Sequence, residues 1–218
     1  MKNFKRLKIS RIFVILTLLA IFILISAISY VDAVSNNISD SVFRLHVIAN
    51  SDSEEDQTLK LKVRDNLLEY MNTIAKDSTN KEEAMRIASE HKNEFIQIAE
   101  KTIRENGYEY TVNIQIGKAD FPTKYYGDIT LPAGEYDALK VEIGEAKGKN
   151  WWCVMFPSLC FIDISSGIVD SEGKEKLENN LDSESYELIS ESKTSTEFKL
   201  KFKLLEVFSH NGLFTAKN

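Results

Sequence analysis

An uncharged apolar segment near the N-terminus constrains this chain more than any other feature of its sequence. Residues 12–31 contain twenty positions without one charged side chain, and about twenty apolar residues are enough to cross a bilayer as a helix. Five basic residues precede the segment, at Lys2, Lys5, Arg6, Lys8 and Arg11. This arrangement keeps an N-terminus in the cytoplasm and sends the following residues across the membrane. We therefore predict a cytoplasmic basic stub and membrane segment over residues 1–35 and one extracytoplasmic domain over residues 36–218.

The sequence leaves the fate of the apolar segment open. Residues 12–31 are long enough to stay in the membrane as an anchor, while Ala33, Val34 and Ser35 lie where a signal peptidase would cut a signal peptide. A buried core helix is the remaining alternative, but such a helix is seldom apolar on every face over this length.

The exported part of the chain is acidic. The whole chain has a net charge of −6, and because residues 1–35 are net basic, the negative charge is concentrated in residues 36–218. Nucleic acids and anionic lipid surfaces bind through clustered Lys and Arg. We therefore expect neither as a main partner; contact with the membrane is expected through the N-terminal segment alone.

Hydrophobic periodicity predicts an α+β fold with two N-terminal helices packed on a mainly antiparallel sheet. Residues 42–48 alternate apolar side chains with Arg44 and His46, which is typical of a half-buried strand. A helix is expected to follow a capping segment and reach about residue 74, and a second helix is expected over residues 80–106.

The second half of the chain reads mainly as strands. Strands are expected over residues 108–116, 128–131, 138–143 and 151–164, with the two middle ones paired antiparallel across a turn at residues 132–134. Residues 165–195 lack a sustained period apart from a short helix near residues 174–181, so they are expected to be a variable excursion. Residues 198–208 fit a strand or a helix, and we favour a helix.

No catalytic or metal-binding pattern stands out. The chain contains no G-x-S-x-G or H-E-x-x-H motif, and it has three histidines and no C-x-x-C pair. We predict neither an enzyme nor a metal site nor a small-molecule cofactor. In an oxidising compartment Cys153 and Cys160 can form a disulfide across a short proline-containing loop, and two buried thiols are the alternative.

Directional polar side chains gather where the first strand meets the next helix. A well-capped helix with a solvated first turn explains residue types of this kind, but such junctions also carry binding sites. Two adjacent tryptophans add a second feature, since neighbours on a strand face opposite ways and an exposed Trp favours an interface. The candidate partner-binding residues are Arg44, His46, Asn50, Ser51, Asp52, Gln57, Lys60, Trp151 and Trp152.

Several long motifs resemble the stage II sporulation protein R family. They are FRLHVIANSDS at residues 43–53, KLKVRD at 60–65, FPTKYYG at 121–127, LPAGEY at 131–136 and GKNWWCVMFPSLCF at 148–161. An N-terminal export segment is also what that family carries.

The resemblance implies an intercellular sporulation signal and not an enzyme. Such a protein is made in the forespore and exported into the space between the two membranes that separate it from the mother cell. It there activates a membrane-embedded aspartic protease of the mother cell, stage II sporulation protein GA, which cleaves the precursor of the mother-cell sigma factor. An exported hydrolase that acts on cell wall or peptide is the alternative that the residues leave open.

Overall fold

The central strand β1 (Phe43–Ile48) lies in the middle of a four-stranded sheet. The structure is a computed structural model that describes residues 2–159 and 171–190. The order of strands is β2–β5–β1–β6, with bounds Val112–Phe121 for β2, Gly134–Ile143 for β5 and Asn150–Phe156 for β6. β1 runs parallel to β5, whereas the β2–β5 and β1–β6 pairs are antiparallel. The α+β class is confirmed, and the sheet is mixed because its two central strands run parallel.

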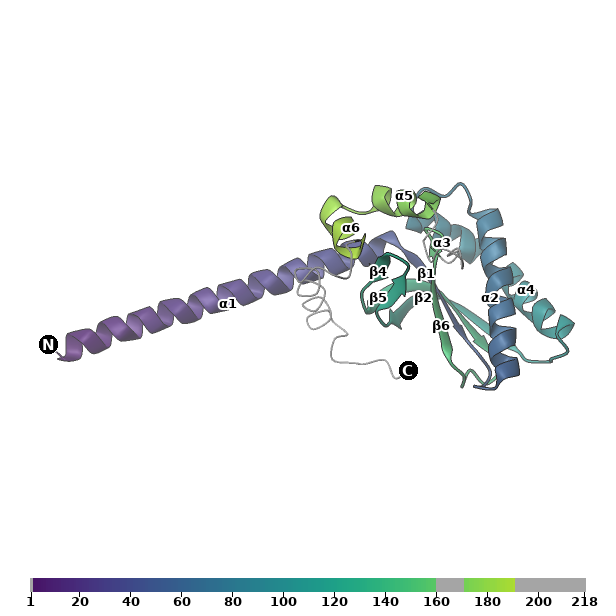
Figure 1. The fold of residues 1–218 in the computed structure, drawn as a ribbon, viewed down its shortest axis with the longest axis horizontal. Helices are drawn as coiled ribbons and strands as arrows, with labels where there is room; N and C mark the ends of the chain where they lie inside the picture. The colour runs from purple at the N-terminus through teal and green to yellow at the C-terminus, as the bar shows by residue number, and fades with distance from the viewer. Residues whose placement is uncertain (1, 160–170, 191–218) are drawn as a thin grey trace.

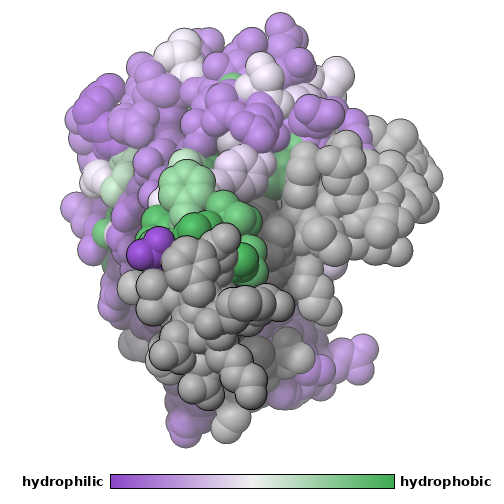
Figure 2. Space-filling view, turned by 90° about the vertical axis from the view of Figure 1, so that its left-hand side faces the viewer, coloured by the Kyte–Doolittle hydropathy of each residue, from purple (hydrophilic) through white to green (hydrophobic). Residues whose placement is uncertain are grey.

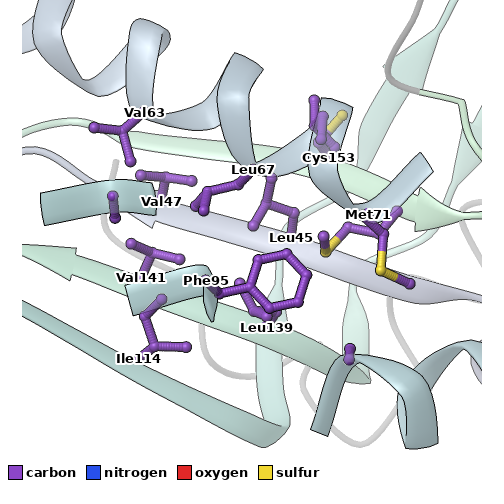
Figure 3. Close-up of a cluster of buried hydrophobic side chains, with 14 of the residues drawn as sticks. Leu45, Val47, Val63, Leu67, Met71, Phe95, Ile114, Leu139, Val141 and Cys153 are labelled. Atoms are coloured by element: carbon purple, nitrogen blue, oxygen red, sulfur yellow. The ribbon is translucent and has the colours of Figure 1, made fainter. Parts of the chain in front are cut away.

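β1 is buried on both faces, which corrects the prediction of a half-buried strand. All six of its residues are buried. Leu45 and Val47 point into the core beneath the helices, where Figure 3 shows them beside Leu67 and Phe95. Arg44 and His46 alternate with them and therefore face the other side of the sheet. The polar residues of β1 thus lie inside the protein and not on its surface.

Three helices cover one face of the sheet, not the two that were predicted (Figure 1). They are α2 (Glu54–Ile74), α3 (Lys81–Glu90) and α4 (Lys92–Glu105). The chain leaves helical geometry at His91, which has φ −99° and ψ 19° and whose Nδ1 lies 2.9 Å from the hydroxyl oxygen of Tyr70. The break lets α3 pack on β1 while α4 packs on α2 and β2.

Smaller elements cover part of the other face. β3 (Lys124–Tyr126) and β4 (Ile129–Leu131) pair with each other, so the predicted pairing of residues 128–131 with 138–143 is wrong. The predicted excursion at 165–195 contains α5 (Ser171–Asn180) and α6 (Ser183–Ser190). Their buried leucines and isoleucine join a second apolar cluster with β4 and the end of α1. Residues 165–170, 191–195 and 198–208 lie outside the described part of the chain.

The N-terminal helix α1 (Lys2–Ser41) contains the predicted membrane segment. Its Arg11–Ser41 part is long and apolar enough to cross a membrane, with a mean hydropathy of 3.0 in its most apolar stretch, which suggests a signal sequence or a membrane anchor. The helix passes through the predicted boundary at residue 35 and ends in the domain. Only Val42 separates it from β1.

A network of ion pairs around the buried Lys81 and Asp137 joins four of these elements. Lys81 Nζ at the start of α3 lies 2.7 Å from Asp137 Oδ2 on β5 and 3.5 Å from Asp40 Oδ1 on α1. Lys118 on β2 reaches the same Asp137 oxygen at 3.2 Å. Burial raises the pKa of Asp137, but the hydrogen bonds from Lys81 and Lys118 outweigh it and hold that pKa below its usual value of 3.8.

Replacement of Asp137 by Asn should therefore destabilise the fold. The variant leaves the buried Lys81 with only the longer ion contacts to Asp40 at 3.5 Å and Glu82 at 4.0 Å, and we expect the free energy of unfolding to fall by about 3 kcal/mol near pH 7. Because the pKa of Asp137 is lowered in the fold, the difference from the wild type should shrink as the pH falls below about 3.8. The measurement is urea unfolding of the full chain in mild detergent, followed by Trp fluorescence.

Glu90→Gln is the matched control. Glu90 pairs with Arg86 at 2.7 Å, but both side chains are more than half exposed, and such pairs contribute less than about 1 kcal/mol. Equal losses for the two variants would contradict the assigned role of Asp137.

Candidate functional site

Two loops lie side by side at the end of the sheet where β1 meets α2. Residues 49–53 connect β1 to α2, and residues 144–149 connect β5 to β6. The backbone N–H groups of Lys147 and Gly148 donate to the carbonyls of Asn50 and Ala49, at 3.2 and 2.9 Å. Asp52 Oδ1 accepts a hydrogen bond of 2.7 Å from the backbone N–H of Lys149. We call residues 49–53 and 144–149 together the two-loop surface.

Two glycines allow this close approach. A Cβ added to Gly148 would lie 2.6 Å from the carbonyl carbon of Ser51, and one added to Gly144 would lie 2.9 Å from Asn50 Cγ. Gly144 also has a φ of +59°, a conformation that L side chains rarely adopt. The two glycines thus serve the packing of one loop against the other.

Asp56 in the first turn of α2 organises the first loop from beneath. Its Oδ2 accepts hydrogen bonds of 2.8 Å from Asn50 Nδ2 and 2.6 Å from Ser51 Oγ, and its backbone N–H donates to the N-cap Ser53 Oγ at 3.2 Å. Burial raises the pKa of Asp56, but the hydrogen bonds from Ser51, Asn50 and Tyr110 prevail and hold it below its usual value. The carboxylate is therefore a charged structural acceptor.

Gln57, next to Asp56, and Lys60, one turn further along α2, connect both loops. Gln57 Nε2 donates to the Ser51 carbonyl at 2.8 Å. Lys60 Nζ donates to Gln57 Oε1 at 2.7 Å and to the Lys149 carbonyl at 3.0 Å. Only 3% of Lys60 is exposed, and burial together with the nearby charges of Arg64 and Lys149 lowers its pKa. These contacts hold the two-loop surface in one conformation.

His46 lies beneath the surface and contacts the residue that follows the second loop. Its Nε2 is 2.7 Å from Asn150 Oδ1, and its ring stacks on Trp152 with centroids 3.7 Å apart. Burial lowers the pKa of His46 to about 4, although the hydrogen bond with Asn150 acts in the opposite direction. The imidazole is therefore neutral near pH 7.

Arg44 lies at the other end of β1, away from the two-loop surface. It is fully buried, its Nη2 donates to the hydroxyl of Tyr126 at 2.8 Å, and its guanidinium carbon lies 4.0 Å from the ring centroid of Phe121 and 4.6 Å from that of Tyr136. No acidic side chain of the described residues pairs with it. In this conformation Arg44 is inaccessible to a partner.

Trp151 and Trp152 face opposite sides of the sheet, as expected, but both are partly buried. Trp151 packs on the helical side, where the guanidinium carbon of Arg64 lies 4.2 Å from its ring centroid, while Trp152 covers His46. Neither is a freely exposed anchor. Cys153 is buried and Cys160 lies outside the described residues, so their disulfide stays a prediction.

The structure thus brings most of the predicted residues together. Asn50, Ser51, Asp52, Gln57 and Lys60 form and support the two-loop surface. Sequence reasoning missed the other half of that surface, where Glu145, Lys147 and Lys149 are exposed. The signal that could have found them is the pair of glycines at 144 and 148, because a glycine often marks close backbone approach.

A family model described as Stage II sporulation protein R matches residues 39–166, which is more than half of the chain and includes both loops. The chain belongs to this family. It is 42% identical over 139 residues to the Stage II sporulation protein R of Bacillus subtilis (strain 168). The aligned part covers 64% of this chain and 62% of that relative, so the match spans less than two thirds of the relative's length. The relative's name is that of a sporulation protein and not of an enzyme. No solved structure matches the chain.

Gly148→Ala should disrupt the packing of the two loops. The added methyl group would overlap the backbone of Ser51, so we expect a loss of about 1–3 kcal/mol in the free energy of unfolding. Gly117→Ala is the matched control, since an added Cβ there meets nothing within 4 Å, and it should change stability by less than about 0.5 kcal/mol. Urea unfolding measures both, and a neutral Gly148→Ala would refute the proposed tight contact.

His46 should make the fold sensitive to mild acid. Its pKa is about 4 in the fold and 6.5 in the unfolded chain, so between these values the unfolded state binds more protons. Stability should therefore fall as the pH is lowered from 6.5 to 4, with a contribution from His46 on the order of 3 kcal/mol. His46→Gln should lose this part of the pH dependence while His91→Gln keeps it, as measured by urea unfolding at several pH values. Identical pH profiles for the wild type and His46→Gln would show that His46 has no such effect.

Proposed function

We propose that this protein is an exported signalling ligand that activates a membrane-embedded aspartic protease of the mother cell, stage II sporulation protein GA. The activated protease then processes the precursor of the mother-cell sigma factor. The protein itself is made in the forespore and acts in the space between the two membranes. The observation that carries the proposal is membership of the sporulation family over residues 39–166, together with an N-terminal helix suited to export.

The two-loop surface is the contact that we propose for the protease. It presents exposed side chains of both signs, Asp52 and Glu145 against Lys147 and Lys149, which suits a polar receptor surface of complementary charge. A hydrogen bond accepted by Asp56 and those donated by Gln57 and Lys60 hold it in place before binding. A preorganised surface avoids part of the entropy cost of association.

Activation follows if the ligand prefers one state of the receptor. A ligand shifts a protease toward its active conformation only as far as it binds that conformation better than the inactive one. In this scheme the protein needs no catalytic group of its own, and Arg44 and His46 act indirectly by supporting the strand that carries the first loop.

Charge reversal of Lys147 tests this contact. Its side chain is exposed and pairs only with Glu145 among the described residues, at 2.7 Å, so Lys147→Glu should leave the fold intact. We expect at least about a tenfold loss of sigma-precursor cleavage, because an inverted charge at an interface repels the partner's group. The assay is co-expression of this chain, the protease and the precursor in a non-sporulating host, with cleavage followed by blot. Lys101→Glu on α4 is the control, because Lys101 is also exposed and, within residues 2–159 and 171–190, pairs only with Glu105.

Asp52→Asn removes the charge of Asp52 from the two-loop surface but preserves its hydrogen bond to the second loop. The amide oxygen of Asn can still accept the hydrogen bond from Lys149, so the loops should stay in place while the charge is lost. Reduced cleavage with unchanged export and thermal stability supports the contact. Full cleavage with both Lys147→Glu and Asp52→Asn would exclude the two-loop surface. Peptide or cell-wall cleavage by the purified chain alone would favour the hydrolase alternative.

A further inference from the structure

The last part of α1 is bound to the domain by side-chain contacts along one face of the helix. Ser41 Oγ donates to the Asn180 carbonyl at 2.6 Å, and Asn37 Oδ1 accepts from the backbone N–H of Asp182 at 3.3 Å. Tyr30 donates from its hydroxyl to Glu184 Oε1 at 2.9 Å. All three partners lie at the connection between α5 and α6. We call residues 30–41 of α1 the stem.

The same face of the stem also supplies apolar packing. Val34 and Ile38 are buried, with 5% and 0% exposed, and Val42 follows them. These residues belong to one apolar cluster with Leu177 of α5 and Ile189 of α6. The spacing 30, 34, 37, 38 and 41 places all the contacts on one side of a helix. The stem is therefore part of the domain and not a linker that leads to it.

The position where a signal peptidase would cut lies inside this docked stem. Ala33, Val34 and Ser35 are helical, with the Tyr30 contact on one side of them and the Asn37 and Ser41 contacts on the other. The chain contains no glycine or proline before Gly107, so nothing in the sequence interrupts the helix between the apolar segment and the domain. Cleavage there would require the stem to unwind and Val34 to leave the core.

We infer that the stem stays uncut, so that the apolar segment remains in the membrane and the docked domain is held with α6 beside that membrane and the two-loop surface at the end of the sheet remote from the stem. Figure 1 shows α1 projecting from the α6 side, whereas β1 runs from the end of α1 to the opposite end of the sheet. In Figure 2, seen along α1 from its N-terminal side, apolar residues gather near the centre and mostly hydrophilic residues lie above and to the left of them. A hydrophilic surface of this kind suits the aqueous side of a membrane.

This orientation adds to the proposed function, and the identity of the partner depends on that proposal. A domain fixed in this way holds the two-loop surface on the aqueous side, at a fixed distance from its own membrane. The protease would then be contacted from across the intermembrane space by a tethered ligand and not by one that diffuses freely.

Intact mass and membrane partition test the anchoring without any reference to the protease. The full chain is expressed with its own N-terminus and an affinity tag at its C-terminus, and membranes are extracted with alkaline carbonate. We expect the exported protein at its full mass in the membrane pellet. A soluble product that begins near residue 36 would overturn the inference and leave the proposed function intact.

A pair of insertions tests whether the docked helix is what prevents cleavage. Seven residues, about two helical turns, are inserted between Val31 and Asp32, either as a Gly/Ser stretch or as seven alanines. Both insertions supply small residues that a signal peptidase accepts, but only the alanines continue the helix. We expect cleavage and release of the Gly/Ser variant and full mass for the alanine variant. Equal cleavage of both, or of neither, would show that the helix does not control processing.

Discussion

Burial of β1 on both faces is the constraint on which the rest of the structure depends. A strand enclosed between β5 and β6 and covered on both sides has to place its polar side chains among interior partners, although Nε and Nη1 of Arg44 and Nδ1 of His46 make no hydrogen bond within the described residues. Arg44 and His46 are the two such side chains. Arg44 is surrounded by the rings of Phe121 and Tyr136 and bonded to Tyr126, and His46 is stacked on Trp152 and bonded to Asn150. Aromatic residues of β2, β3, β5 and β6 thus pack around the polar side chains of the central strand.

Local signals allowed much of the fold to be predicted from the sequence. The first helix follows a capping segment as expected, since Ser53 Oγ accepts from the Asp56 N–H. The next helix begins after Asn80, whose Oδ1 accepts from the Glu83 N–H. The break at His91 was missed because the apolar spacing continues unchanged from Ala88 to Phe95. The parallel pairing of β1 with β5 was missed because it joins strands that are almost a hundred residues apart, and nothing local records such a contact.

The candidate site likewise has one half that local sequence signals predicted and one half that they did not. Its predicted half lies on one continuous segment, where the turn and the first helical turn necessarily bring Asn50, Asp52 and Gln57 together. Its other half comes from residues 144–149, which only the tertiary fold places beside that segment. The alternation of β1 correctly placed Arg44 and His46 opposite Leu45, but alternation cannot show whether the second face of a sheet is exposed or covered.

The connection between α1 and β1 is a single residue, Val42. A flexible linker would let a domain swivel about its attachment and sample a volume that grows with linker length. This domain has no such freedom, since the strand that begins after Val42 is also the centre of its sheet. If the apolar segment stays in the membrane, the protein reaches outward only as far as the domain itself extends. The width of the gap between the two membranes would then decide whether the ligand and its receptor can meet.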